Sequence, residues 1–226
     1  MSIEKTNIDF TIEEYLLSQG QNDNECLEHI FISAYDYPEP YMQISKLQAS
    51  ILQSFIKQNN IRTIYEVGTF VGFSSFVMAK ALPSDEGSVT SVEIEKDFYE
   101  RALLNMDVHK KTYKNKDISQ KLHYIYDDAK NHLKSMSREK AEKIDMFFLD
   151  GDKHNYDWYY NWAVNNLRSG SYFIIDNILF KGKVVTDITN EYAQSIRAMT
   201  ERFHSENKFD YYFIPVGDCM LVAKKR

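Results

Sequence analysis

The sequence predicts an α/β fold with a mostly parallel sheet of seven strands, an antiparallel strand at its C-terminal end, and a group of helices before the sheet. Short apolar and β-branched runs alternate with helical patterns from residue 61 onward, which is typical of a parallel sheet covered by helices on both faces. The last two runs are separated only by residues 216–218, so we expect them to form a hairpin. Residues 9–59 carry helical patterns alone.

The N-terminal segment predicts three helices. The first is expected to begin near Asp9 or Thr11, whose side chains can cap a helix, and to end at Gly20. The second is expected over residues 24–34, before two prolines interrupt the pattern within residues 35–41. The third has apolar residues at helical spacing, namely Leu47, Ile51, Leu52 and Phe55.

The remainder of the chain predicts strands and helices in alternation. Helices are expected over residues 73–82, 96–106 and 188–204, among others, because their apolar residues recur at helical spacing. The expected strands cover residues 61–67, 88–93, 122–126, 144–149, 171–175, 210–215 and 219–224.

Length and composition predict one globular domain. The chain has 226 residues, of which 43% are hydrophobic and 27% are charged, enough for a sizeable core. We expect a single domain over residues 1–226, with a helical cap at 1–59 and an α/β core at 60–226. No apolar run reaches membrane-spanning length, and the first residues lack the basic and apolar blocks of a signal peptide. The sequence therefore predicts a protein that does not enter a membrane.

Charge and cysteine usage limit the partners and the compartment. The formal net charge of −6 argues against a dominant nucleic-acid surface, although the basic runs at 110–111 and 224–226 leave room for a local one. Cys26 and Cys219 lie far apart without metal-site spacing, which favours buried free thiols in a reducing compartment. We expect a cytoplasmic protein that does not bind nucleic acid.

The segment IRTIYEVGTFVG, residues 61–72, predicts a strand that ends in a glycine turn and leads into a helix. Glycines at Gly68 and Gly72 allow the backbone to approach a ligand, and the helix start presents free N–H groups. The spacing differs from the G-x-G-x-x-G fingerprint of dinucleotide sites. Glu66 beside the turn would repel a pyrophosphate, but it can pair with an amino-bearing or cationic ligand such as S-adenosylmethionine.

A second acidic residue strengthens the interpretation of a nucleoside site. Glu93 ends the second predicted strand, about 20 residues beyond the glycine turn, where nucleoside-binding α/β folds hold a ribose diol. Either signal alone is weak, and both glutamates could be ordinary solvated strand ends. Together, and in this order, they favour a nucleoside-type ligand.

Acidic and amide residues follow two further predicted strands. Asp150 ends the fourth strand, and Asp176 with Asn177 ends the fifth. The carboxyl ends of neighbouring parallel strands lie at one edge of the sheet, and their oxygen donors suit a hard cation such as Mg²⁺, Mn²⁺ or Ca²⁺. The alternative is structural, with Asp150 capping the next helix and the other two residues forming a turn. Spacing alone leaves both interpretations open.

Three segments, IYEVGTFVGFSS, FFLDGDKHNY and IIDNILFKGKV, resemble the signatures of the cation-dependent O-methyltransferases, the caffeoyl-CoA and catechol O-methyltransferase group. The resemblance extends from about Tyr41 to the C-terminus and closes with IPVGDCMLVAKK. It implies a class I methyltransferase, Rossmann-like fold, S-adenosylmethionine as cofactor, and a divalent cation, most simply Mg²⁺.

The resemblance also implies roles for individual residues. The residues that match metal ligands are Asp150, Asp176 and Asn177. The residues that match cofactor contacts are Met42, Glu66, Gly68, Thr69, Ser74, Glu93, Asp128 and Asp150, with Glu93 on the ribose. The residues expected around the substrate are Tyr41, Lys153 and Phe180; the family usually has a tryptophan in place of Phe180.

Lys153 matches the general base of the catechol enzymes. Methyl transfer from a sulfonium needs a nucleophile that is an oxyanion or close to one, and a bound cation lowers the pKa of a coordinated hydroxyl. A lysine beside that cation feels its positive field, which favours the neutral amine and makes it a better base. Without the motif, Lys153 would be interpreted as a solvated lysine at a helix start.

These observations favour an enzyme that methylates a hydroxyl of a small molecule, most simply a catechol or another vicinal diol of natural-product metabolism. One alternative is a tRNA hydroxyuridine O-methyltransferase, because bacterial relatives with a similar LFKG segment have that activity. A non-catalytic cofactor-binding module is disfavoured, since the proposed metal ligands and base are all present. We also expect a homodimer, in which the helical cap covers the active site.

Overall fold

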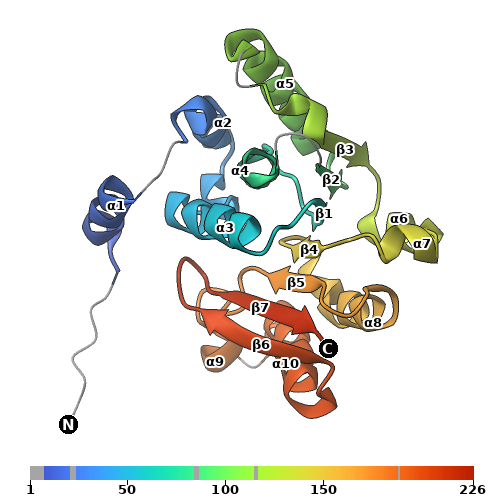
Figure 1. Ribbon diagram of the computed structural model, residues 1–226. Helices are drawn as coiled ribbons and strands as arrows, with labels where there is room; N and C mark the ends of the chain where they lie inside the picture. The colour runs from blue at the N-terminus through green and yellow to red at the C-terminus, as the bar shows by residue number, and fades with distance from the viewer. Residues whose placement is uncertain (1–7, 21–23, 84–86, 115–116, 188) are drawn as a thin grey trace.

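The computed structural model describes the chain over residues 8–20, 24–83, 87–114, 117–187 and 189–226. Seven strands form one central sheet with helices on both faces (Figure 1). The strands are β1 (Thr63–Val67), β2 (Ser88–Glu93), β3 (Leu122–Tyr126), β4 (Met146–Leu149), β5 (Tyr172–Ile175), β6 (Phe209–Ile214) and β7 (Met220–Lys225).

The helices fall between these strands, as the alternating pattern predicts. The α-helices are α1 (Phe10–Gln19), α2 (Glu28–Ser33), α3 (Lys46–Gln58), α4 (Phe73–Ala81), α5 (Lys96–Thr112), α6 (Ala129–Ser135), α7 (Arg138–Ala141), α8 (Tyr156–Asn166), α9 (Lys183–Thr186) and α10 (Glu191–Glu206). Short 3₁₀ helices are η1 (Glu25–Leu27), η2 (Ala34–Asp36), η3 (Pro40–Met42), η5 (Ser119–Lys121) and η6 (Lys153–Asn155).

The strand order is β3-β2-β1-β4-β5-β7-β6, and it confirms the predicted fold class. The first five strands are mutually parallel, whereas β7 runs antiparallel to both β5 and β6. The C-terminal hairpin is present, and its second strand is inserted between β5 and the edge strand β6. The reason is compositional: residues 220–223 of β7 are all buried, while β6 exposes part of its length to solvent.

Side chains alternate between two separate hydrophobic cores. In β4, Met146 and Phe148 join the core beneath α2, α3 and α4, whereas Phe147 and Leu149 join the core beneath α6, α8 and α10. This follows from the two-residue period of a strand. A parallel strand that is covered on both faces is therefore apolar along its whole length, as β4 is.

The N-terminal helices partly follow their predicted bounds. The side chain of Asp9 accepts a hydrogen bond from the backbone N–H of Ile12 (3.0 Å) and caps α1, which ends before Gly20 as expected. The second predicted helix is instead divided into η1, α2 and η2. The start expected for the last helix at position 188 lies outside the described residues; α10 begins after the capping side chain of Asn190.

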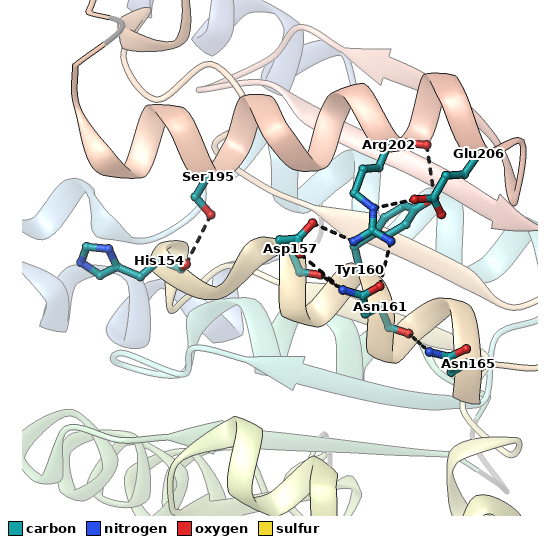
Figure 2. Close-up of polar contacts among 8 residues, drawn as sticks. All are labelled: His154, Asp157, Tyr160, Asn161, Asn165, Ser195, Arg202 and Glu206. Carbon is teal, nitrogen blue, oxygen red and sulfur yellow. Dashed lines mark hydrogen bonds and ion pairs between the residues drawn. The ribbon is translucent and has the colours of Figure 1, made fainter.

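Polar contacts connect helix α10 to η6 and α8 (Figure 2). The guanidinium of Arg202 donates to the side chains of Asp157 and Asn161, at 2.7 Å each. The hydroxyl of Ser195 donates to the backbone carbonyl of His154 (3.4 Å). These contacts fix the position of η6, which lies at one end of the cavity described below. Within the described stretches, no helix is long and apolar enough to cross a membrane.

Candidate active site

The turn after β1 packs directly against the turn after β4. Gly68 has a φ of +96°, and a Cβ there would lie 3.1 Å from the backbone carbonyl of Asp150. Gly72 has a φ of +89° and precedes α4; a Cβ there would lie 2.6 Å from the hydroxyl of Tyr124. Both positions therefore require glycine for conformation and for space. The close packing brings the glycine turn and the end of β4 to one point of the sheet edge.

Glu93 closes the glycine turn from the side of β2. One carboxylate oxygen accepts hydrogen bonds from the backbone N–H groups of Thr69 (3.0 Å) and Phe70 (2.9 Å), and the other accepts from Glu95 (2.9 Å). The Thr69 hydroxyl also contacts the Ser91 hydroxyl (2.6 Å). The carboxylate is thus oriented by the backbone, and Glu93 lines the main cavity.

Glu66 lies beneath the turn rather than in the cavity. It is fully buried, and its carboxylate accepts hydrogen bonds from the hydroxyls of Ser74 (2.5 Å) and Ser75, both in the first turn of α4. Burial raises the pKa of Glu66 to about 7, opposed by these hydrogen bonds. Glu66 therefore connects β1 to α4 and does not line the cavity.

The ends of β4 and β5 bring two buried carboxylates and an amide together. The pKa of Asp150 is raised well above its usual value by burial and by the charge of Asp176, and its Oδ1 accepts no hydrogen bond from the described residues. Burial raises the pKa of Asp176 to about 6. Asn177 has a left-handed φ of +58° and donates its backbone N–H to Asp176 (2.7 Å).

These three side chains offer only oxygen donors of the kind that hard divalent cations bind. Within the described stretches, no group of three or more His, Cys, Asp or Glu side chains is arranged to hold a metal ion. Asp150, Asp176 and Asn177 are not such a group, because they supply two carboxylates and one amide. The buried Asp150 oxygen without a hydrogen-bond donor is the observation that suits a cation, because a buried charge needs a partner.

Lys153 lies next to this group. Its ammonium nitrogen is 4.0 Å from Asp150 Oδ1, and its side chain is 19% exposed. Asp152 precedes it with a left-handed φ of +54°, which begins η6. The neighbouring ring of His154 packs on Tyr192, with the ring centroids 4.0 Å apart. Lys153 is therefore held beside the carboxylates by the turn after β4.

One cavity of about 910 Å³ joins the glycine turn to the ends of β4 and β5. The cavity is lined by residues of η3 and the adjoining segment, of η6, and of the loop after β5. The predicted site residues that line it are Tyr41, Met42, Gly68, Thr69, Ser74, Glu93, Asp150, Lys153, Asn177 and Phe180.

Three predicted residues do not line this cavity. Glu66 and Asp176 are buried behind its wall. Asp128 caps α6 by accepting a hydrogen bond from the backbone N–H of Asn131 (2.9 Å). That contact is the ordinary use of an aspartate before a helix.

Sequence reasoning missed three residues of the site. Gln48 donates its side-chain amide to both oxygens of Asp176, at 2.9 and 3.0 Å. Asp218 lines the cavity and accepts from the backbone N–H of Lys181, whose ammonium lies 4.3 Å from the ring centre of Tyr41. Lys181 and Asp218 lie in the segments IIDNILFKGKV and IPVGDCMLVAKK that resemble the family, but no role was assigned to them. Ser45 and Gln48 have capping-box spacing, which predicts a helix start but says nothing of Asp176.

The strand order, with a cavity over the carboxyl ends of β1, β4 and β5, defines a class I methyltransferase fold. A family model described as O-methyltransferase matches residues 17–226. The chain therefore belongs to the O-methyltransferase family, and it is an O-methyltransferase. The predicted resemblance to the caffeoyl-CoA and catechol O-methyltransferase group is confirmed.

Individual relatives agree with this assignment. A Dictyostelium discoideum protein named probable caffeoyl-CoA O-methyltransferase 3 is 30% identical over 228 residues, covering 91% of this chain and 88% of the relative. A catechol O-methyltransferase of Niastella koreensis is 29% identical, covering 67% and 65%. The structure of a Bacillus cereus O-methyltransferase in complex with SAH has a TM-score of 0.83 at 23% identity, covering 96% and 97%.

Proposed function

We propose that this O-methyltransferase uses S-adenosylmethionine and a divalent cation to methylate a hydroxyl of a small molecule, a catechol or another vicinal diol. The observation that carries the proposal is the single cavity, which joins the glycine turn and Glu93 to Asp150, Asn177 and Lys153. A methyl donor held at the first end and an acceptor held at the second would meet within one cavity.

The cofactor half of the proposal rests on Glu93 and the turn that it orients. The carboxylate is fixed by the N–H groups of Thr69, Phe70 and Glu95, and the lone pair that remains on its second oxygen can accept a hydrogen bond from a ribose hydroxyl. The Bacillus cereus relative is a complex with SAH, which is the demethylated form of this cofactor.

The proposed cation site depends on the oxygen atoms that the ends of β4 and β5 supply. Asp150, Asp176 and Asn177 would hold the ion, which would contact the buried oxygen of Asp150 that accepts no hydrogen bond among the described residues. The bound cation would lower the pKa of an acceptor hydroxyl, and adjacent hydroxyls of a catechol suit two open positions. Lys153, 4.0 Å from Asp150, would take the proton of that hydroxyl.

Loss of the Glu93 carboxylate should weaken cofactor binding. In Glu93→Ala, the ribose hydroxyls lose a charged acceptor that is worth about 1.5–3 kcal/mol. The dissociation constant for S-adenosylhomocysteine, measured by calorimetry, is therefore expected to rise at least tenfold. Asp9→Ala is the control, because Asp9 caps α1, does not line the cavity and should leave the affinity nearly unchanged. Equal affinities of Glu93→Ala and the wild type would show that Glu93 does not bind the cofactor.

The C-terminal basic run gives the tRNA alternative little support. The ammonium of Lys225 donates to backbone carbonyls of the α8 end, including Val164 (2.6 Å), and Arg226 pairs with Asp210. A cation that is occupied within the fold contributes little to phosphate binding. A non-catalytic module is also disfavoured, because Lys153, Asp150 and Asn177 lie together on the cavity.

A methyl-transfer assay separates these possibilities. We expect labelled methyl to pass from S-adenosylmethionine to catechol or caffeate in the presence of Mg²⁺, and a monohydroxylated phenol to react much more slowly. Unmodified tRNA and tRNA that contains hydroxyuridine serve as the competing acceptors. Labelling of the hydroxyuridine tRNA together with no labelling of any vicinal diol would overturn the small-molecule proposal.

The cap, the oligomeric state and the compartment stay predictions. Residues 1–59 are proposed as a cap over the 60–226 core of one domain, since Tyr41 and Met42 line the cavity from the cap side. A homodimer is expected, and light scattering at micromolar concentration would contradict it by giving the mass of one chain. A cytoplasmic location is expected from the cysteine usage.

A further inference from the structure

We propose that Gln48 is the positioning residue that aims the Asp176 carboxylate at the cation site and links that site to the N-terminal helices. The inference rests on the proposed function, because it assigns Gln48 to the cation that Asp150, Asp176 and Asn177 would share. Gln48 itself does not line the cavity and is not a catalytic residue.

The Gln48 side chain is 3% exposed, and every polar atom of its amide is engaged. Its nitrogen donates to Oδ1 and Oδ2 of Asp176, at 2.9 and 3.0 Å. Its oxygen accepts from the backbone N–H of Ser45 (2.9 Å), while the Ser45 hydroxyl accepts from the Gln48 N–H (3.2 Å). The capping box at the start of α3 thus fixes the amide with its nitrogen toward Asp176.

The turn between β6 and β7 holds the same amide from the opposite side. Gly217 lies so close that a Cβ there would be 2.4 Å from the Gln48 side-chain oxygen and 2.6 Å from its amide carbon. The amide is therefore packed between the first turn of α3 and the Gly217 backbone. It has no room to adopt another orientation without moving one of these segments.

Gln48 is the only side chain that donates a hydrogen bond to the Asp176 carboxylate among the described residues; the other donor is the backbone N–H of Asn177. Oδ1 accepts from both Gln48 and Asn177, whereas Oδ2 accepts only from Gln48 and keeps a lone pair for a cation. Groups that orient a metal-ligating carboxylate typically raise metal affinity 10–100-fold. Because Gln48 is 128 residues from Asp176 in the chain, this contact also couples the docking of α3 to the cation site.

Removing the amide should weaken cation binding selectively. In Gln48→Leu we expect the affinity for Mn²⁺, measured by electron paramagnetic resonance of the free ion, to fall about 10–100-fold relative to wild type. The affinity for S-adenosylhomocysteine, measured by calorimetry without added metal, should stay within about twofold. A merely structural role would lower both affinities together, because an unfolded fraction binds neither ligand.

The chain offers a matched control on the same helix. Gln53 is 8% exposed, and its amide donates to Asn24 (2.9 Å) and to the backbone carbonyl of Val77 (3.3 Å), away from Asp176. Gln53→Leu removes a comparable buried amide and should leave Mn²⁺ affinity unchanged. Gly217→Ala pushes the Gln48 amide from its other side and should also lower Mn²⁺ affinity, which keeps the test informative if Gln48→Leu folds poorly.

Two outcomes would overturn the inference. They distinguish failure of the inference alone from failure of the proposed function. If wild type binds Mn²⁺ and both Gln48→Leu and Gly217→Ala bind it equally well, Gln48 does not position Asp176 for the cation. The proposed chemistry would then still stand. If wild type binds no Mn²⁺ at all, the cation-dependent function fails, and the role of Gln48 fails with it.

Discussion

Lys153→Met should lower kcat on a catechol about 10²–10⁴-fold, the range typical of a lost general base. The lysine nitrogen lies 4.0 Å from Asp150 Oδ1, within reach of a hydroxyl held at the same carboxylate. Methionine keeps the length of the side chain but cannot take a proton. Affinity for S-adenosylhomocysteine should change little, because Lys153 contacts neither the glycine turn nor Glu93 in any described hydrogen bond. Affinity for Mn²⁺ should not fall, because the substitution removes a positive charge beside Asp150. Single-turnover kinetics and calorimetry measure the two effects separately.

A substrate that needs no base provides the control. A nitrocatechol has a hydroxyl that is already ionised at neutral pH, so the loss caused by Lys153→Met should shrink strongly on this acceptor. His154→Ala, which changes the adjacent residue, should reduce kcat similarly on both acceptors if its ring only packs against Tyr192. An equal loss on catechol and nitrocatechol in Lys153→Met would mean that Lys153 positions the acceptor or the cation, and another base would be needed.

Removal of the divalent cation should abolish turnover. We expect excess chelator to reduce catechol methylation to background, and Mg²⁺ or Mn²⁺ to restore it. The double variant Asp150→Ala/Asp176→Ala should lose activity that added cation cannot restore, because two of the three proposed ligands are gone. Initial rates at a series of free Mg²⁺ concentrations measure both effects.

The double variant needs a check on folding, since both aspartates are buried. Their pKa values are raised by burial, so two costly buried carboxylates are removed, and the thermal midpoint without metal should not fall steeply. Retained affinity for S-adenosylhomocysteine would show an intact cofactor half. Full activity in excess chelator, or ordinary Mg²⁺ activation of the double variant, would contradict the cation-dependent mechanism.

The strands were predictable because their signal is local. The predicted bounds 88–93 and 122–126 match β2 and β3, and the turn after β1 was identifiable from its two glycines. The N-terminal helices were less predictable. Residues 25–36 form η1, α2 and η2 in succession, and Cys26, Leu27, Ile30 and Ala34 pack into the core that also contains α4.

Local pattern also identified part of the cavity, since strand-end residues of a parallel sheet lie at one edge. Glu93, Asp150 and Asn177 line the cavity for this reason. The direction of a side chain at the edge was not predictable. Glu66 points to the core beneath α4, where the hydroxyls of Ser74 and Ser75 donate hydrogen bonds to its carboxylate. Successive side chains of β1 point to opposite faces of the sheet, and Glu66 lies on the face that α4 covers.

The sequence by itself determined the class of fold, the family, and the set of polar residues at the strand ends, because each depends on short stretches of chain. The tertiary structure decided which of those residues line the cavity and which, such as Glu66, are buried beneath it. It also decided the partner of Asp176, since the Gln48 amide comes from 128 residues away. Periodicity and motif spacing describe neighbours along the chain, whereas this contact exists only because α3 packs against the sheet and Gly217 leaves room for it.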